Sequence, residues 1–287
     1  MPGVGIVADT TACLPAELAE RYGIEVVPLQ LMVDGRAYLD GVDITPAEFY
    51  GMLPRARSLP TTSPSSPGTY IEAFRRMAQR SSSIVCITVS KALSAMFDSA
   101  RSAAETAMGM SSGLTIEVVD SGTAAGADGW IVLAAARAAA AGGTHKQVVE
   151  AACSMKPRVH LIAVIDTLNY LAKGGRVPQV AAWASSALQI KPVIRIMPEG
   201  DGVKLVSRPR TKRRAVDVML AVTGKLAEGK PLHAMVHHSN ALDEAEELKQ
   251  RVVARFKCAE VYVKDFTPVM GVHTGPGLLG IAFYVGD

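Results

Sequence analysis

Short runs rich in β-branched residues alternate along the chain with longer segments of helical period, and this alternation restricts the fold more than any other feature. Two parallel strands need a long crossover connection, usually a helix, so repeated alternation is typical of α/β proteins with a mainly parallel sheet. The first half therefore predicts a Rossmann-like α/β domain. Its expected strands are Gly5–Ala8, Ile24–Leu31, Ile84–Thr88 and Thr115–Val119.

Helix starts in this half carry recognisable caps. Thr45-Pro46 and Ser66-Pro67 each place a hydroxyl residue before a proline, which favours an N-cap followed by the first helical residue. Asp34-Gly35, flanked by apolar alternation, is typical of a tight hairpin turn. The expected helices are Pro15–Arg21, Pro46–Leu53, Pro67–Gln79, Ala95–Met108 and Ala125–Ala140.

The pattern restarts near residues 155–158, so we expect two α/β domains, residues 1–156 and 157–287, the second with a mixed sheet and flanking helices. Asp201-Gly202 predicts a second hairpin turn. No low-complexity linker separates the halves, which favours a shared interface and makes that interface a natural place for a ligand. The expected strands are Arg158–Ile165, Ile190–Ile196, Val203–Val206, Leu232–His237, Glu260–Val263 and Ile281–Val285, and the expected helices are Leu168–Lys173, Val177–Leu188, Thr211–Leu226 and Asp243–Phe256.

Charge and cysteine spacing argue against several functions. With 30 basic and 27 acidic side chains the net charge is +3, too small and dispersed to predict nucleic-acid binding, and only 5% of the residues are aromatic. The four cysteines lie far apart, so we expect buried free thiols, no zinc knuckle or other metal site, and no disulfide scaffold.

The sequence also predicts a cytoplasmic protein without a membrane span. Its N-terminus lacks the basic and then apolar pattern of a signal peptide. The most apolar stretch, Trp130–Ala141, is short and contains Arg137, so it falls below the length that a membrane helix needs.

Familiar catalytic signatures are mostly absent, among them H-E-x-x-H, G-x-x-x-x-G-K-[ST], G-x-S-x-G and S-x-x-K. The segment Gly275–Gly280 fits G-x-G-x-x-G, but it leads into the expected strand Ile281–Val285. A dinucleotide fingerprint must open a helix, so we reject this match, and no cofactor is expected.

Two hydroxyl-rich segments of the first half are candidates for binding a carboxylate. Pro60–Pro67 concentrates threonine and serine before a helix, and Ser94 is expected at a helix N-terminus, where backbone amides are free. Each segment alone is more often a capped loop, but both follow strands of an open α/β sheet, where ligands bind. Asp9-Thr10-Thr11 and Asp120–Thr123 are interpreted mainly as structural caps.

The second half offers basic residues in glycine-rich surroundings. Asp166–Arg176 predicts a short helix closed by two glycines and followed by arginine, and Gly271–Gly277 predicts a loop that contains His273. The sequence leaves two interpretations of His273, a contact with a ligand or a position in a simple turn. A basic run such as Arg208–Arg214 is usually a solvated helix start. The functional alternative is a docking surface for an acidic partner.

In their order and spacing, several of these segments resemble the DegV family across nearly the whole chain. The resemblance implies two α/β domains that enclose one long-chain fatty acid. It also implies a role as the carrier that presents the acid to a fatty acid kinase, like the fatty-acid-binding subunit of the bacterial fatty acid kinase system. The segments are Asp9-Thr10-Thr11, Pro60–Ser63, Leu93-Ser94, Asp120-Ser121, Thr167–Arg176, Lys191-Pro192, His237–Ala241 and His273–Gly277.

The resemblance also implies roles for particular residues. Thr62 and Ser94, with their neighbours Thr61 and Ala95, look like the groups that bind the fatty acid carboxyl. Where the family usually has Leu-Ser-Gly-Thr, this chain has Leu93-Ser94-Ala95-Met96. Arg176 and His273 look like the residues near the carboxyl or acyl phosphate. The expected docking surface for the kinase consists of Arg176, Arg208, Arg210, Lys212, Arg213 and Arg214.

Two other functions compete with a lipid carrier. The first is an acyl- or phosphoryl-group hydrolase or transferase that uses Ser94 or Ser121 with His273, which would require hydrogen-bond contact between them. The second is a nucleic-acid-binding regulator that uses Arg208–Arg214. The carrier is favoured because the hydroxyl and basic loops occur without a nucleotide-binding loop.

Overall fold

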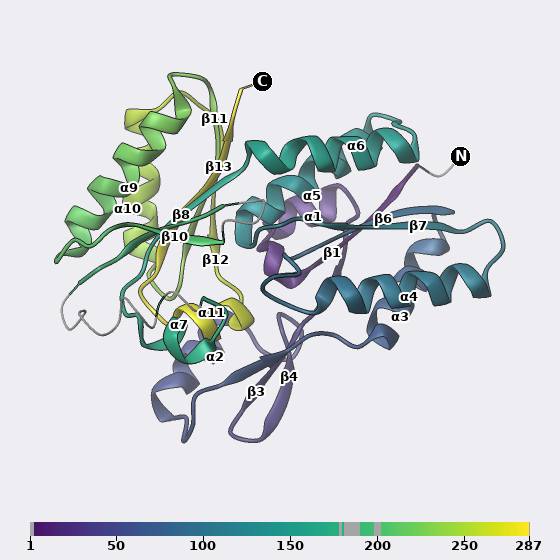
Figure 1. Cartoon of the computed structure of the whole chain (residues 1–287), viewed down its shortest axis with the longest axis horizontal. Coiled ribbons are helices and arrows are strands. Elements are labelled where there is room, and N and C mark those ends of the chain that lie inside the picture. Colours follow the sequence, from purple (N-terminus) through teal and green to yellow (C-terminus); the bar gives the residue numbers. More distant parts are fainter. Residues whose placement is uncertain (1–2, 178–179, 181–189, 198–201, 287) are drawn as a thin grey trace. The chain divides into compact units, whose positions relative to one another are not determined.

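The computed structural model describes residues 3–177, 180, 190–197 and 202–286. The chain divides into two compact units. Unit 1 comprises residues 1–30 and 62–158, and unit 2 comprises residues 31–61 and 159–287. The chain therefore enters unit 2 twice (Figure 1).

Unit 1 is built on a four-stranded parallel sheet with the strand order β2-β1-β6-β7. Strands β1 and β6 are buried along most of their length, as expected for parallel strands with helices on both faces. The expected parallel α/β architecture is confirmed. The strands are β1 (Gly5–Asp9), β2 (Glu25–Val27), β6 (Ser83–Thr88) and β7 (Thr115–Asp120).

Where a helix was predicted in unit 1, its observed bounds lie within two residues of the expected ones. The hydroxyl of Ser66 accepts a hydrogen bond from the Thr69 N–H at 3.2 Å, so Ser66 is the N-cap of α3. The expected helices do not include α6, although Thr144 and Gln147 form a capping box at its start. The helices are α1 (Ala16–Arg21), α3 (Pro67–Ala78), α4 (Met96–Met110), α5 (Ala125–Ala140) and α6 (His145–Met155).

A separate three-stranded sheet has the order β4-β3-β5. Asp34 and Gly35 adopt φ angles of 48° and 85°, as a two-residue hairpin requires, so the predicted turn is confirmed. The predicted strand Ile24–Leu31 is wrong in extent, because it breaks at Pro28, which has no N–H for a sheet ladder. The elements are β3 (Gln30–Val33), β4 (Arg36–Leu39), β5 (Thr61–Ser63) and helix α2 (Pro46–Met52).

Unit 2 contains a six-stranded mixed sheet with the order β10-β9-β8-β13-β11-β12. Strands β11 and β12 run parallel, and the other neighbouring pairs are antiparallel. Helices α9 and α10 bury Met219, Leu220 and Leu248 in the core of this sheet, so the expected mixed sheet with flanking helices is confirmed (Figure 1). The elements are β8 (His160–Val164), β9 (Val193–Ile196), β10 (Val203–Ser207), α9 (Lys212–Ala227), β11 (Leu232–His238), α10 (Leu242–Arg255), β12 (Cys258–Asp265) and β13 (Leu279–Val285).

Two short helices complete unit 2, α7 (Asn169–Gly174) and α11 (Pro268–Thr274). Helix α7 agrees with the predicted helix, whereas α11 contradicts the prediction that residues 271–277 form a loop, because Pro268 opens a helix that runs to Thr274. The predicted helix Val177–Leu188 and the predicted turn at Asp201 lie largely outside the described residues.

Residues 31–61 are bound firmly to the rest of unit 2. The Val269 N–H donates a hydrogen bond to Oδ1 of the buried Asp40 at 3.2 Å. Helix α2 packs on α11, where a Cβ atom on Gly271 would lie 2.5 Å from the Tyr50 hydroxyl. This close packing of α2 against α11 explains why a glycine occupies position 271 in the middle of α11.

Among the described residues, no helix is long and apolar enough to cross a membrane, and no three or more His, Cys, Asp and Glu side chains gather to hold a metal ion. None of the four cysteines, all of which lie in the described part of the chain, forms a disulfide bond. Cys13 and Cys86 are buried as expected, but Cys153 is exposed and Cys258 is half-buried, so the expectation of buried thiols is wrong for these two.

Candidate functional site

Asp9 and Asp120, two polar residues that the sequence analysis names in the first half, lie at the carboxyl edge of the unit 1 sheet, at the ends of β1 and β7. The Val89 N–H donates to Oδ2 of Asp9 at 2.9 Å, and the Lys91 N–H donates to Oδ1 of Asp120 at 3.2 Å. Each carboxylate therefore fixes the loop that leaves a neighbouring strand.

Ser94 and Ala95 lie in the turn between β6 and α4. The expectation that Ser94 caps the helix is wrong, because α4 begins at Met96 and its N-cap is Ala95, which has no side-chain oxygen. The Ser94 N–H donates to the carbonyl oxygen of Ser90 at 3.1 Å, which holds Ser94 one residue before the cap. The first amides of α4 thus have no side-chain cap, and the half-buried Ser94 lies beside them.

Met96, which departs from the family pattern, joins the two hydroxyl-rich segments. Its side chain is fully buried, and its Sδ atom accepts a hydrogen bond from the Ser65 N–H at 3.1 Å. The Ser65 hydroxyl in turn donates to the carbonyl oxygen of Pro28 at 2.5 Å. The sequence analysis did not anticipate that a thioether holds these loops together.

The threonines of the candidate site lie on β5, with Thr61 exposed and Thr62 half-buried. Ser65 follows Thr62 by three residues and Met96 follows Ser94 by two, so the Ser65–Met96 contact brings the two segments to the same edge. That Thr62 and Ser94 hold one head group stays a prediction.

In unit 2, α7 and α11 pack together, and glycines permit their close approach. A Cβ atom on Gly174 would lie 2.8 Å from Nδ1 of His273, and one on Gly275, whose φ is +69°, would lie 2.2 Å from the Tyr170 ring. His273 is therefore held in the last turn of α11 beside the end of α7.

Arg176 and His273 are near enough to interact electrostatically. Arg176 follows Gly175, which ends α7 in the left-handed conformation, and its Nη1 donates to the Gly174 carbonyl oxygen at 2.8 Å. Burial and, to a smaller extent, the charge of Arg176 lower the pKa of His273 to about 4. His273 is therefore neutral at pH 7, beside an exposed guanidinium group. The roles that the resemblance implies for them stay predictions.

An ion pair absent from the sequence predictions fixes the loop after β8. Nζ of Lys191 lies 2.7 Å from Oδ1 of Asp166 and donates to the Asp166 carbonyl oxygen at 3.0 Å. The Lys191 N–H also donates to the carbonyl oxygen of Pro209 at 2.7 Å. A carboxylate directly after a strand was the available signal, but its partner is remote in sequence.

The basic run 208–214 leads into α9, whose N-cap is Thr211. Lys212 forms an ion pair with Glu244 of α10 at 2.6 Å, so part of its charge is compensated. Through Pro209 the run adjoins the Lys191–Asp166 pair. The exposed basic residues are Arg208, Arg210, Arg213 and Arg214.

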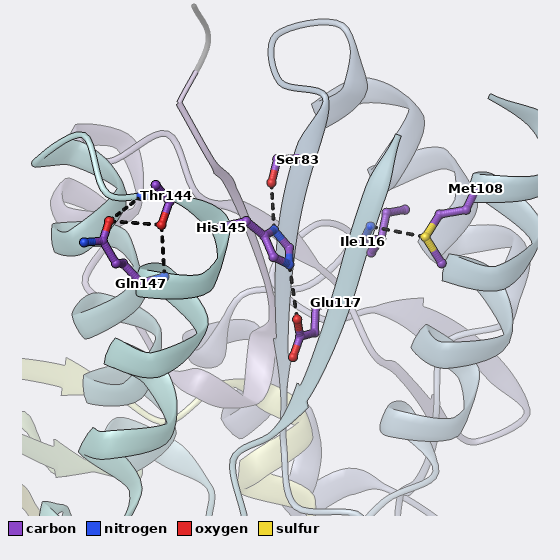
Figure 2. Close-up of polar contacts among 7 residues, drawn as sticks. All are labelled: Ser83, Met108, Ile116, Glu117, Thr144, His145 and Gln147. Atoms are coloured by element: carbon purple, nitrogen blue, oxygen red, sulfur yellow. Dashed lines mark hydrogen bonds and ion pairs between the residues drawn. The ribbon is translucent and has the colours of Figure 1, made fainter. Parts of the chain in front are cut away.

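The serine named in the enzymatic alternative has its hydroxyl engaged, because Ser121 is fully buried and donates to the carbonyl oxygen of Thr123 at 3.2 Å. A different serine contacts a histidine in unit 1 (Figure 2). The Oγ atom of Ser83 lies 2.7 Å from Nδ1 of His145, whose Nε2 lies 3.2 Å from Oε2 of Glu117. These contacts tie the start of α6 to β6 and β7.

The structure is that of a two-unit α/β protein with candidate anion-binding groups in both units. Unit 1 has a parallel sheet with hydroxyl-rich loops, and unit 2 has a mixed sheet and an arginine beside a neutral histidine. The chain belongs to the DegV family: the model of that family, described as "Uncharacterised protein, DegV family", matches residues 3–286. A DegV domain-containing protein of Streptomyces coelicolor is 36% identical over 280 residues, which cover 97% of each chain.

Solved structures show the same similarity. A DegV family protein from Thermus thermophilus, described as fatty acid binding, has a TM-score of 0.90 at 28% identity, covering 99% of this chain and 100% of its own. DegV from Bacillus subtilis, described as a fatty acid binding protein, has a TM-score of 0.87 at 26% identity, covering 100% of both chains. A stearic-acid-binding protein from Eubacterium ventriosum has a TM-score of 0.88 at 26% identity, covering 98% of both chains.

Proposed function

We propose that this protein binds one long-chain fatty acid and presents the carboxyl group to a separate fatty acid kinase in the cytoplasm. The observation that carries the proposal is the similarity, over nearly the whole chain, to solved structures described as fatty acid binding. The acyl chain is predicted to lie between the two halves of the chain, as the resemblance implies.

The carboxyl group is proposed to bind at the carboxyl edge of the unit 1 sheet. The hydroxyls of Thr62 and Ser94, with Thr61 and Ala95 beside them, are donors that require no charge neutralisation of their own. The uncapped first turn of α4 adds backbone N–H groups and the positive end of a helix dipole, both of which favour an anion.

Burial of the acyl chain supplies most of the affinity in this proposal. At about 0.8 kcal/mol per buried methylene, a chain of about 14 methylenes gains about 11 kcal/mol. Association costs about 4–15 kcal/mol, so the two terms are comparable. The hydrogen bonds to the head group therefore decide whether binding is tight.

Arg176 and His273 are proposed to act after the acid is phosphorylated. An acyl phosphate carries more negative charge than a carboxylate, and a guanidinium group pairs well with phosphate oxygens. Because His273 is neutral, it can donate one hydrogen bond to the phosphate without adding charge. The kinase is proposed to dock on Arg176 and on the exposed arginines of the basic run, with Lys212.

The enzymatic alternative has less support. The Ser121 hydroxyl is buried and engaged, and a histidine with a pKa of about 4 is a weak general base at neutral pH. A carrier requires neither an activated serine nor a strong base.

Mass spectrometry of the purified protein under denaturing conditions tests lipid binding directly. We expect one long-chain fatty acid to be released per chain. Repeated absence of lipid, together with no binding of added fatty acid in calorimetry, would contradict the proposal.

The kinase step needs a separate assay. Protein loaded with fatty acid is incubated with a fatty acid kinase and ATP, and acyl phosphate is trapped with hydroxylamine. We expect Arg176→Ala to slow product formation at least tenfold without changing the bound lipid, while Arg101→Ala on the exposed face of α4 serves as the matched control. Equal rates for both variants would remove Arg176 from this role.

A further inference from the structure

Strand β12 forms an edge of the unit 2 sheet whose backbone is open to a further strand. With eight residues it is the longest strand in the described part of the chain, where it pairs only with β11, and none of its residues is buried. After a shift near its start, this pairing is regular. The Phe266 N–H, just beyond the strand, donates to the His238 carbonyl oxygen of β11 at 2.8 Å. Because backbone groups alternate in direction along a strand, those of Val261, Val263 and Asp265 point to the open edge.

Helix α10 lies over β11 and β12, whereas α9 lies over β8, β9 and β13 (Figure 1). Two ion pairs identify the side of α10 that faces α9. Glu244 pairs with Lys212 of α9 at 2.6 Å, and Arg251 pairs with Asp217 of α9 at 2.5 Å. The opposite side of α10 therefore borders the open edge of β12.

This opposite side carries a stripe of four residues, Leu242, Glu246, Lys249 and Val253. At about 100° per helical residue, all four point away from the side that pairs with α9. Leu242 and Val253 are 56% and 53% exposed, although large apolar side chains are usually covered. Oε2 of Glu246 lies 3.4 Å from Nζ of Lys249 between them. Exposed apolar side chains beside an open strand edge indicate a surface for protein contact.

The stripe on α10 is complementary to a second copy of itself. When two copies pack antiparallel about a two-fold axis through the middle of α10, Leu242 of one copy meets Val253 of the other. The same axis sets Glu246 of one copy against Lys249 of the other, because both pairs have the same midpoint. Apolar residues thus meet apolar residues, and opposite charges meet.

Strand β12 allows the same symmetry. In the antiparallel register centred on Tyr262, the outward backbone groups of Val261 meet those of Val263 in the second copy and can form hydrogen bonds. This register also sets Glu260 opposite Lys264, a favourable cross-strand pair. The registers centred on Val261 or Val263 do not pair these two charges.

One axis can serve both the helix and the strand. The middle of α10 lies about 11 Å, and Tyr262 about 13 Å, from the connection that joins α10 to β12, from the rise per residue of a helix and of a strand. Neighbouring strands lie about 4.8 Å apart, and α10 lies over both β11 and β12. Two copies of α10 would therefore lie about 10 Å apart, which is a usual distance for packed helices.

We propose that this protein forms a symmetric homodimer in which β12 and α10 of two copies pair across a two-fold axis. The two six-stranded sheets join into one continuous sheet, and Leu242 and Val253 become covered on its helical face. Such a closed interface occupies an edge that would otherwise be open to unspecific strand pairing. The proposal does not depend on fatty acid binding.

Sedimentation velocity of the full-length protein tests whether the dimer forms. Over a concentration series from low to high micromolar, we expect the mass to rise to twice that of the chain. Leu242→Arg combined with Val253→Arg sets like charges against each other, so we expect the dissociation constant of the dimer to rise at least about tenfold. Val206→Arg, at an exposed apolar position of the opposite edge strand β10, is the matched control. A protein that stays monomeric throughout, or equal dissociation constants for these variants, would overturn the proposal.

Cross-linking locates the symmetry axis. Residues that face each other in a non-hydrogen-bonded antiparallel pair have Cα atoms about 4.5 Å apart, which suits a disulfide. In protein with Cys153→Ser and Cys258→Ser, we expect Tyr262→Cys to form a disulfide between two chains under mild oxidation, and Val206→Cys to form none. No cross-link at position 262, or equal cross-linking at both positions, contradicts the proposed axis.

The charged pair of α10 gives a test that leaves the apolar contacts and β12 unchanged, and it decides if Tyr262→Cys does not fold. Glu246→Lys sets a lysine against Lys249 of the second copy, and we expect the dissociation constant to rise about threefold. Adding Lys249→Glu to Glu246→Lys exchanges the two charges and should restore the original value. A double variant that dimerises no better than Glu246→Lys alone contradicts the antiparallel contact of the two helices.

Discussion

The two units differ in the buried groups whose pKa values are shifted. Unit 1 buries the carboxyl groups of Asp9 and Asp128, and desolvation raises the pKa of both. Unit 2 holds His160, His237 and His273 in largely desolvated positions, where burial lowers their pKa values to about 4, about 3 and about 4. Burial thus favours protonation of these two carboxyl groups and opposes protonation of these three imidazoles.

The two sets of groups lie in different local architectures. The carboxyl groups of unit 1 lie where parallel strands end and helices begin, and there the hydrogen bonds from backbone amides to Asp9 offset part of the rise that burial causes. The imidazoles of unit 2 lie on or beside a mixed sheet, and Nδ1 of His237 contacts the Lys264 carbonyl oxygen at 3.3 Å. Two α/β units of one chain can therefore respond to acid in opposite directions.

The largest expected effect concerns the close packing in unit 2. Gly275→Val places a branched side chain at φ +69° and within 2.2 Å of the Tyr170 ring, so we expect a loss of about 3 kcal/mol or more in the free energy of unfolding. Gly229→Ala, also at positive φ but with open space around it, should cost about 1 kcal/mol. Urea unfolding measures both, and similar losses would show that the contact with Tyr170 is unimportant.

The next prediction asks whether the unit 1 edge binds a carboxylate through neutral hydroxyls. Thr62→Val combined with Ser94→Ala removes two donors, and we expect fatty acid affinity to fall by at least about 100-fold, since hydrogen bonds to a charged group contribute about 1.5–3 kcal/mol each. Fluorescent fatty acid titration measures the change. Thr115→Val with Ser102→Ala, both exposed, is the matched control, and equal affinities would place the head group elsewhere.

A third prediction tests the opposite acid responses directly. Because the three histidines of unit 2 have lowered pKa values, the stability that depends on their neutral forms is lost as the pH falls from about 6.5 to about 3. The raised pKa values of Asp9 and Asp128 act the other way: their contribution is present below pH 3.8 and is lost as the pH rises through the folded-state values.

Hydrogen exchange measured over this pH range separates the two responses. We expect protection in unit 2 to fall relative to unit 1 on acidification, with a smaller slope in His273→Asn. Parallel pH profiles in the two units would refute the comparison.

The smallest expected effect concerns the sulfur contact of Met96. Met96→Leu conserves apolar volume but leaves the Ser65 N–H without its acceptor, so we expect a loss of about 1 kcal/mol. Met77→Leu, at another buried methionine of unit 1, is the control for packing alone. Equal losses in thermal unfolding would mean that packing, and not the hydrogen bond, accounts for the cost.

Much of the fold could be predicted because local chemistry specifies it. The bounds of α5 match the expectation, and Ser66-Pro67 opens α3 as its cap requires. The start of α6 was missed although Thr144 and Gln147 form a recognisable capping box, and α11 was missed because its glycines resemble those of a loop.

The candidate site could be predicted only in part. The sequence indicates that Ser94 and Arg176 follow the ends of secondary-structure elements, but tertiary packing alone sets Gly174 against His273 and Ser65 against Met96. The sequence analysis did not single out the buried Asp128, although a single acidic residue within an alanine-rich apolar helix indicates an unusual environment.

The double entry of the chain into unit 2 has a consequence for its synthesis on the ribosome. Residues 31–61 emerge early, yet their packing partners on α11 are among the last residues translated. Phe49 and Tyr50, both buried in the finished protein, therefore remain without their α11 partners until the chain is nearly complete. Nascent chains are thus expected to need protection from aggregation at this segment, and chains stalled before residue 268 should be recognised by chaperones.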